Sequence, residues 1–209
     1  MYKVQAISRE VAIGKSPIVD PSETTRRTPF LKAEIEAYLQ GALHDASLNK
    51  VKRYRFTQKG TEWLHTLKDL FAKLGYRAWI YREGKRSVYT LETLAPFLDF
   101  QFDPEELITS GEKASYLRGF FDAEGGIPHH IEAKFYIQLV QKNRLKIEKI
   151  VALLTSLGIA TGTIHNPSSR VDPDYWRVYI RTNSHKDFVR IVSSWHPVKS
   201  QLFLKRMKI

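Results

Sequence analysis

The chain has 209 residues, 43% hydrophobic and 26% charged, a composition that excludes disordered and fibrous proteins. It contains no cysteine, which excludes disulfide scaffolds, zinc ribbons and thiol nucleophiles. Its 33 Lys and Arg against 22 Asp and Glu give a formal charge of +11, and this excess predicts a polyanionic partner, first of all nucleic acid.

The first 30 residues carry three prolines and the pair Arg26-Arg27, and we expect an N-terminal arm over 1–30. Charges are scattered through residues 1–15, so we expect no signal peptide and a cytoplasmic location. As a separate expectation, the host is prokaryotic or archaeal. The longest nearly uncharged stretch, 151–164, is shorter than the roughly 20 residues that cross a bilayer. We therefore expect no membrane span.

Two segments of the chain are similar to one another at a spacing of 83 residues. Residues 57–76 and 140–159 align without gaps; both begin with a Gln-Lys pair and end at a Leu-Gly pair. Both carry apolar residues at i, i+3 and i+4, which indicates one buried helix face. A chance likeness of two apolar helices is the alternative, but two half-domains, 31–110 and 111–209, explain the pattern more economically.

Each half predicts the order helix, strand, helix, strand pair and helix, and therefore an α+β fold. The first helices are expected at 34–45 and 115–124. Alternating apolar and polar residues predict strands in both halves. These strands cover 53–57, 77–81 and 86–92 in the first half and 134–139, 161–165 and 175–181 in the second.

One face of both predicted sheets carries Lys, Arg, Gln and aromatic residues at strand period, and acidic residues are nearly absent from it. A merely solvated face is the alternative, but because the same residue types recur in both halves we expect a nucleic-acid-binding face. Similar but unequal halves predict a pseudo-palindromic target. The candidate DNA-binding residues are Arg53, Arg55, Thr57, Arg77, Trp79, Tyr81, Arg82, Lys85, Arg86, Lys134, Tyr136, Gln138, Thr163, His165, Arg170, Arg177, Tyr179 and Arg181.

The most specific motif is Leu-Arg-Gly-Phe-Phe-Asp-Ala-Glu-Gly at 117–125, and the first half has Leu-Gln-Gly-Ala-Leu-His-Asp-Ala-Ser at 39–47. A carboxylate in the last turn of a helix is electrostatically misplaced. The mid-helix glycines would let the two helices approach closely and bring Asp45 and Glu124 together. Paired carboxylates share a proton or bind a divalent cation. We expect the pair Gly125-Gly126 to supply a left-handed stop that ends the helix just after Glu124.

The second motif resembles the signature of the LAGLIDADG homing endonucleases, and the resemblance covers residues from about 31 to 205. The first motif departs from the pattern, because Asp45 follows Gly41 by four residues whereas Glu124 follows Gly119 by five. A one-residue deletion, with the helix closing early, would still deliver Asp45. The resemblance implies a monomer made of two αββαββα-like half-domains in tandem pseudo-two-fold duplication. Motif helices would form the interface, and two saddle-shaped antiparallel sheets would straddle duplex DNA.

The resemblance also implies the roles of site residues. Asp45 and Glu124 would be metal ligands, with Mg²⁺ as cofactor, Mn²⁺ able to substitute and Ca²⁺ binding without turnover. Gln58 and Gln141 would help position the attacking water, the alternative being that they cap the helices that follow. Asp122 is expected to be structural.

Two lysines are candidates for the basic residue near the scissile phosphates. Lys199 is the first and Lys142 the second, with an ordinary phosphate contact as the alternative role for Lys199. The adjacent His129 and His130 are expected to be loop or DNA contacts, because neighbouring strand residues point to opposite faces and no cysteine supports a metal site.

The expected function is Mg-dependent, site-specific double-strand DNA cleavage in intron homing. The alternative is a protein of the same fold that binds without cutting, either an intron maturase with an RNA partner or a DNA-binding regulator. Both acids and both glutamines favour the nuclease, and the shortened first motif favours its rival.

Overall fold

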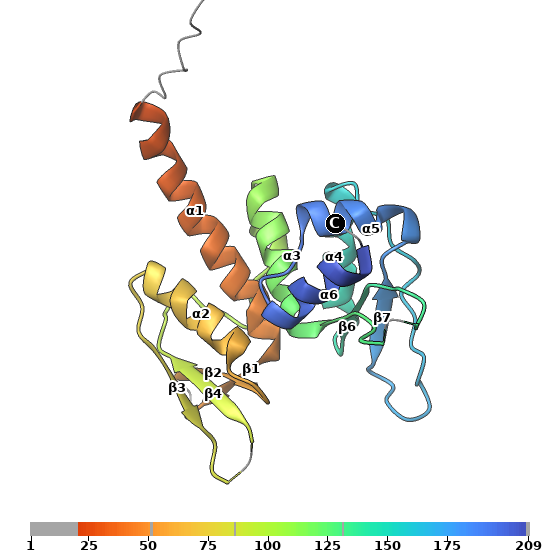
Figure 1. The fold of residues 1–209 in the computed structure, drawn as a ribbon, viewed down its shortest axis with the longest axis horizontal. Coiled ribbons are helices and arrows are strands. Elements are labelled where there is room, and N and C mark those ends of the chain that lie inside the picture. The colour runs from red at the N-terminus through yellow and green to blue at the C-terminus, as the bar shows by residue number, and fades with distance from the viewer. Residues whose placement is uncertain (1–20, 51, 86, 131, 208–209) are drawn as a thin grey trace, which may run out of the picture.

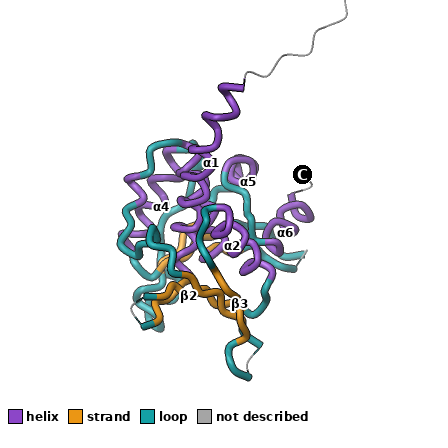
Figure 2. Tube along the Cα trace, turned by 90° about the vertical axis from the view of Figure 1, so that its left-hand side faces the viewer, coloured by secondary structure: helices purple, strands orange, loops and turns teal. Residues whose placement is uncertain are grey.

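The computed structural model describes residues 21–50, 52–85, 87–130 and 132–207. The two halves lie side by side, each a sheet at the bottom of Figure 1 with helices above it. Figure 2 shows the strands low in the molecule, with the helices on one side of them. Each sheet therefore has one covered face, which forms the core, and one uncovered face. No helix in the described part of the chain is long and apolar enough to cross a membrane.

Helix α1 (Pro21–Ala42) continues into a 3-10 turn, η1 (Leu43–Asp45). It begins ten residues before position 31, where we expected the first half-domain to start, so residues 21–30 of the expected arm are helical. Proline is tolerated in the first turn of a helix because the N–H that it lacks would have no partner there. Residues 1–20 of the expected arm lie outside the described residues.

The first half carries a regular four-stranded antiparallel sheet in the order β1-β2-β4-β3. Its strands are β1 (Ala46–Asn49), β2 (Arg53–Gln58), β3 (Ala78–Arg82) and β4 (Tyr89–Thr93). Helix α2 (Glu62–Lys73) packs on the sheet through fully buried Trp63, Leu64 and Leu67. Phe56 and Leu91 face it at zero exposure, which confirms the predicted apolar alternation.

The second half has helices α3 (Ser110–Glu124), α4 (Arg144–Ser156), α5 (His185–Ile191) and α6 (Pro197–Met207). Its sheet is smaller, in the order β5-β6-β7, with β5 (Gly125–Gly126), β6 (Gln138–Gln141) and β7 (Trp176–Tyr179). Two short 3-10 turns, Pro104–Glu106 and Thr182–Ser184, complete the described elements.

The second sheet is less regular than its sequence predicted. Residues 134–137 are not in a strand, and the run 161–165 joins the sheet only through two isolated bridges, Thr161 to Ile180 and His165 to Arg177. Pro128 follows β5 closely and has no N–H to donate, which accounts for the early end of pairing on that side of β6.

The two halves meet along α1 and α3, and two glycines determine how closely these helices approach. A Cβ added at Gly41 would lie 2.1 Å from the Tyr116 carbonyl oxygen, and one added at Gly119 would lie 2.0 Å from that of Tyr38. Any side chain at either position would push the helices apart. The contacts are reciprocal, which confirms the predicted close approach and gives the interface its pseudo-two-fold symmetry.

Candidate functional site

The C-terminal ends of the two central helices bring together the two predicted acids. Asp45 ends η1 and Glu124 ends α3, and each is followed at once by a strand. Both side chains are half-buried, and the charge of Asp45 acts on Glu124. The expected left-handed stop at Gly125 is wrong: its φ of −84° is extended. The glycine is needed for space, because an added Cβ would lie 2.1 Å from a ring carbon of Phe121.

The 3-10 turn compensates for the missing residue of the first motif. Gly41 and Gly119 occupy equivalent positions between the helices, so the first acid arrives one residue early. Ala46, just after Asp45, pairs with Phe56, and Gly125, just after Glu124, pairs with Leu139. Phe56 and Leu139 are equivalent at the spacing of 83, so both acids lie at the same helix-to-strand junction. A 3-10 turn uses fewer residues per turn than an α-helix, which supplies the shift.

Burial of the two acids disfavours their charged forms. Burial raises the pKa of Asp45 to about 6, against the opposing effects of a hydrogen bond from Gln58 and the charge of Lys199. Burial, and then the charge of Asp45, raises the pKa of Glu124 to about 7. Among the described residues, only the charges of Lys199 and Lys142 oppose this shift. A cation between the carboxylates would relieve both effects.

The two predicted glutamines contact different partners. The Gln58 side-chain amide donates directly to the carboxylate of Asp45. Gln141 instead shares a 3.0 Å hydrogen bond with Nδ1 of His44, while its oxygen accepts from the backbone N–H groups of Lys142 and Asn143. Gln58 is therefore hydrogen-bonded to one of the two acids. Gln141 is not bonded to an acid; it contacts His44 and the backbone just before α4.

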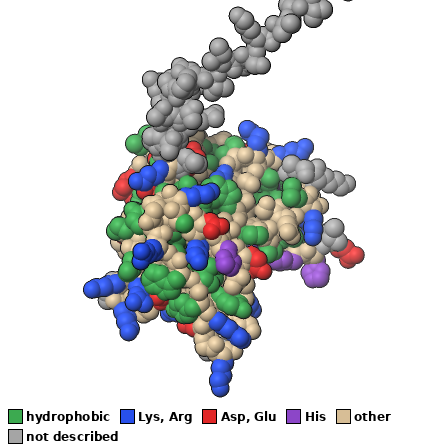
Figure 3. Space-filling view, turned by 60° about the vertical axis from the view of Figure 1, so that its left-hand side comes forward, with side chains coloured by type: hydrophobic (Ala, Val, Ile, Leu, Met, Phe, Trp, Pro, Cys, Tyr) green, Lys and Arg blue, Asp and Glu red, His purple; other side chains and the backbone are tan. Residues whose placement is uncertain are grey.

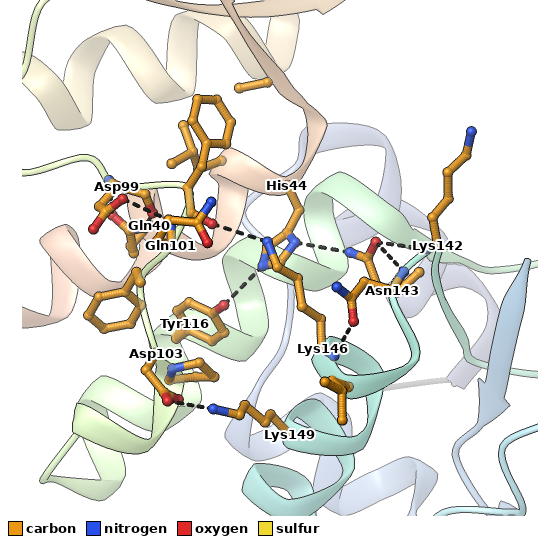
Figure 4. A pocket seen from close by; sticks show the side chains of 17 residues that line it. Gln40, His44, Asp99, Gln101, Asp103, Tyr116, Lys142, Asn143, Lys146 and Lys149 are labelled. Carbon is orange, nitrogen blue, oxygen red and sulfur yellow. Dashed lines mark hydrogen bonds and ion pairs between the residues drawn. The ribbon is translucent and has the colours of Figure 1, made fainter. Parts of the chain in front are cut away.

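Lys199, in α6, reaches the C-terminal end of α3, close enough for the charges of Asp45 and Glu124 to act on it. Its Nζ donates to the carbonyls of Phe121 and Asp122 at 2.7 and 2.8 Å. Burial lowers the pKa of Lys199 to about 8, although Asp122, Asp45 and Glu124 favour its charged form. Lys142 is exposed, and in Figure 4 its side chain points away from the labelled pocket. Of the two predicted lysines, Lys199 is the one held at the site.

The uncovered face of the first sheet differs from the expectation of a face nearly free of acids. Glu92, in the middle of β4, is 3% exposed at its side chain and binds both predicted arginines of β2. Its carboxylate lies 3.2 Å from Nη1 of Arg53 and 3.3 Å from Nε of Arg55. Glu83 binds Arg55 as well, at 2.9 Å. These arginines belong to a charge-balanced cluster.

On the uncovered face of the second sheet, the central arginine is Arg177, and it forms no ion pair with an acid among the described residues. Arg177 receives support from Tyr179 and Tyr175, whose hydroxyls accept from its guanidinium at 2.9 and 3.2 Å. His165 stacks on Tyr179, with ring centroids 5.7 Å apart, and Tyr136 meets the same ring edge-on. This face therefore carries cationic and aromatic groups beside Gln138 and Val140, the cross-strand partners of Tyr179 and Arg177.

The remaining DNA-binding candidates lie around these two clusters. Trp79 and Tyr81 share the uncovered face with Glu92 and Thr90, their cross-strand partners, and Thr57 bonds Thr90 on that face. Arg82 directly follows Tyr81 in β3 and therefore belongs to the opposite face of the sheet. Arg86 lies outside the described residues. Exposed candidates are Arg77, Lys85, Lys134, Thr163, Arg170 and Arg181, while Gln138 is half-buried in β6. In Figure 3, Lys and Arg side chains end the projections at the lower edge of the molecule.

Residues 111–195 match the model of the LAGLIDADG-like domain. The whole arrangement resembles a crystal structure of I-DmoI in complex with DNA and Mn, with a TM-score of 0.60 and 23% identity over 79% of this chain and 99% of that one. This chain has the LAGLIDADG fold. A mesophilic variant of the homing endonuclease I-DmoI gives a TM-score of 0.63 at 21% identity, over 83% and 98% of the two chains.

The N-terminal LAGLIDADG domain of DUF199/WhiA shares the fold, with a TM-score of 0.60 and 15% identity over 77% of this chain and 81% of that one. No curated protein matches the chain. The family model covers the half with the regular LAGLIDADG motif and leaves out the half in which the motif is one residue short.

The penultimate acid of the second LAGLIDADG motif is structural, as expected. Asp122 is buried and accepts from the Tyr38 hydroxyl at 2.7 Å and from the backbone N–H groups of Trp195 and His196 at 2.9 and 3.0 Å. The Ser194 hydroxyl donates to it as well. Burial raises its pKa, against these hydrogen bonds. Asp122 thereby joins α1, α3 and the segment before α6.

His44 is the counterpart of Asp122 in the first LAGLIDADG motif, and sequence reasoning gave it no role. Asp122 contacts Tyr38, and His44 Nε2 contacts the hydroxyl of the equivalent tyrosine, Tyr116, at 2.9 Å. Burial, and then the charge of Lys146, lowers the pKa of His44 to about 3. Its position next to Asp45 was the signal available in the sequence.

A cavity of about 390 Å³ lies beside His44, between the segment that joins the halves and the start of α4. Figure 4 shows His44 in its wall, linked to Tyr116. The other ring nitrogen of His44 shares its hydrogen bond with Gln141, which also lines the cavity. Lys149 and Asp103 form an ion pair at its far side. The cavity gives solvent a path to the Gln141 side of the site. The described residues hold no cluster of three or more His, Asp or Glu that could by itself bind a metal ion.

Proposed function

We propose that this chain is a site-specific DNA endonuclease that hydrolyses phosphodiester bonds with a divalent cation held by Asp45 and Glu124. The observation that carries the proposal is the convergence of these two acids at equivalent helix-to-strand junctions, between two uncovered sheets that display arginines. The supporting relatives are the I-DmoI structures, which were solved with DNA and with Mn, Mg or Ca.

The donors fit a hard divalent cation. Mg²⁺ is usually bound by one or two carboxylates and completes its shell with water and substrate phosphates. Asp45 and Glu124 supply two carboxylates whose pKa values are raised mainly by burial, and a bound cation would favour their charged forms. The absence of a larger acid cluster among the described residues agrees with a site completed by the substrate. We propose Mg²⁺ as the physiological cation.

Each residue of the site has a distinct task in hydrolysis. A bound cation lowers the pKa of water and stabilises charge on the attacking and leaving oxygens. Gln58 and Gln141, whose amides reach the rim of the site, orient the attacking water. Lys199, held on the α3 carbonyls with its ammonium near both acids, stabilises the developing charge on the phosphate.

The uncovered sheet faces bind the duplex. A monomer with two similar halves matches a target with two similar half-sites, and strands can enter the major groove to contact base edges. The chemistry of the two faces differs, so the half-sites differ in sequence. We further propose that cutting such a long site serves intron homing.

Binding without cleavage is the second candidate function. Two observations favour it, namely the shortened first motif and the attachment of Gln141 to His44. The shared fold of the WhiA LAGLIDADG domain, at 15% identity, is compatible with it. DNA or intron RNA would then be the ligand.

The deciding experiment incubates the protein with a large duplex DNA library in Mg²⁺ or Ca²⁺ and sequences all new ends. Cleavage predicts discrete ends at one pseudo-palindromic sequence in Mg²⁺ only. Asp45→Asn and Glu124→Gln should lower the rate at least about a hundredfold, because each removes a cation ligand. Exposed Glu148→Gln is the matched control and should cut normally. Tight binding without ends in any divalent cation would establish the second function.

A further inference from the structure

The Glu92 cluster lies on the uncovered face of the first sheet, where phosphates and base edges would be met. We define the cluster as Glu92 with Asn49, Arg53, Arg55 and Tyr81, which come from all four strands. Besides the two arginines, Glu92 Oε1 accepts from the Tyr81 hydroxyl at 2.9 Å and from Asn49 at 3.1 Å. The carboxylate accepts hydrogen bonds from Asn49, Arg53 and Tyr81, and its side chain is almost fully buried.

The cluster removes positive charge from a surface that otherwise attracts DNA. Non-specific affinity rises with the number of phosphates that cationic side chains neutralise. Arg53 and Arg55 are balanced by Glu92 and Glu83, so these four side chains contribute no net charge. These ion pairs are a poor source of stability, because desolvation of the buried Glu92 carboxylate offsets the attraction and the Arg53 side chain is 51% exposed. Its placement on the contact face suggests another role.

The same contacts fix where the arginines can point. Arg53 is held by Glu92 on one side and lies over the ring of Trp79, 5.6 Å from its centroid, on another. Arg55 is held through Nη2, which donates to Glu83 at 2.9 Å, while its Nε lies 3.3 Å from Glu92 without a hydrogen bond; its side chain is 22% exposed. A guanidinium with some donors fixed by acids keeps its remaining donors in one orientation. Bidentate contact with guanine O6 and N7 needs such an orientation.

We propose that Glu92 is a specificity-determining residue of this face, which turns Arg53 and Arg55 from phosphate contacts into oriented contacts with base edges, guanine first. The inference rests on the proposed DNA-binding function and is independent of cleavage. The second half provides the contrast, because Arg177 is held by two tyrosine hydroxyls and keeps its full charge. Glu92 therefore raises selectivity at one half-site only.

The test compares Glu92→Gln with Glu148→Gln, which makes the same change in charge on α4, away from the uncovered faces. Each protein, in Ca²⁺, is bound to a randomised duplex library, and the bound fraction is sequenced. Glu92→Gln should lose about tenfold base preference at positions under the first half and none under the second. Its affinity for a duplex of random sequence should rise several-fold, with a salt slope steeper by about one.

Two results would overturn the inference. One is unchanged base preference in Glu92→Gln, and the other is an equal loss at both half-sites. Because Glu92 is buried, Glu83→Gln is the second variant; its side chain is 44% exposed, and it should weaken preference at fewer positions without a change in folding. A wild-type protein with no base preference at all would instead contradict the proposed function itself.

Discussion

The two halves of the molecule are alike in the backbone contacts of their interface and differ in the side-chain contacts around the site. Gly41 and Gly119 make reciprocal contacts, and both acids lie at equivalent junctions. The partners of those acids differ, since within the described part of the chain Asp45 accepts a hydrogen bond from the Gln58 amide and Glu124 accepts none. A duplicated fold therefore keeps the geometry of its interface under tight control, while each half acquires its own chemistry.

The most sensitive test of the shared interface is an added methyl group. Gly119→Ala and Gly41→Ala should each lower the free energy of unfolding by about 3 kcal/mol or more, because the new Cβ would overlap a carbonyl of the facing helix. Urea unfolding measures the loss. Gly162→Ala is the control, because its Cβ would meet only the Tyr179 carbonyl oxygen at 3.7 Å. Near wild-type stability at both interface positions would disprove the close approach.

Asp122 and His44 occupy equivalent positions in the two motifs, so removing each side chain compares how much it stabilises its own half. Asp122→Ala should cost about 3 kcal/mol, because it leaves several buried donors without an acceptor. His44→Ala should cost only about 1 kcal/mol, because its partners, Tyr116 and Gln141, line the cavity and can bond to water. Thermal unfolding of both variants compares them directly. Equal losses would mean that the two residues are equivalent supports.

Ionisation of Glu124 should cost stability when no cation is bound. The pKa of Glu124 is about 7 in the folded chain and lower in the unfolded chain. The loss of stability therefore begins as the pH rises above the unfolded pKa, and it is complete once the pH exceeds the folded pKa. In EDTA at pH 8, Glu124→Gln should gain about 1–2 kcal/mol, with allowance for partial exposure, and at pH 5 almost nothing.

The measurement is denaturant unfolding at both pH values, with Glu148→Gln as the exposed control. Added Mg²⁺ should stabilise the wild type and not the variant, because a ligand that binds only the native state raises its stability. A gain of the same size at pH 5 and pH 8 would show that the carboxylate charge is not its source.

Much of the fold followed from local patterns. The repeat at a spacing of 83 and the alternation around Phe56 predicted the paired halves and the first sheet. The short second sheet was not predictable, because strands 134–137 and 161–165 have suitable alternation but lack continuous neighbours. Pairing depends on what the rest of the fold places alongside, and alternation carries no such information.

The two acids of the site were predicted from the sequence, whereas Glu92 and His44 were not. Asp45 and Glu124 stand out because carboxylates are unfavourable at the C-terminal ends of helices. Glu92 and His44 do not stand out, since a single Glu in a strand and a single His in a helix are ordinary. Their importance comes from partners in other elements, namely Arg53 and Arg55 for Glu92 and Gln141 for His44.

The 3-10 turn at Leu43–Asp45 has a consequence for how proteins of this fold are compared. A gapless superposition of the two motifs on their glycines sets Ala46 against Glu124 and makes the first half appear to have lost its acid. Strand register shows instead that Asp45 holds the position. A chain with alanine in that column can thus keep the carboxylate one residue upstream. Homologues sorted as inactive by the motif column alone should be sorted again by the helix-to-strand junction.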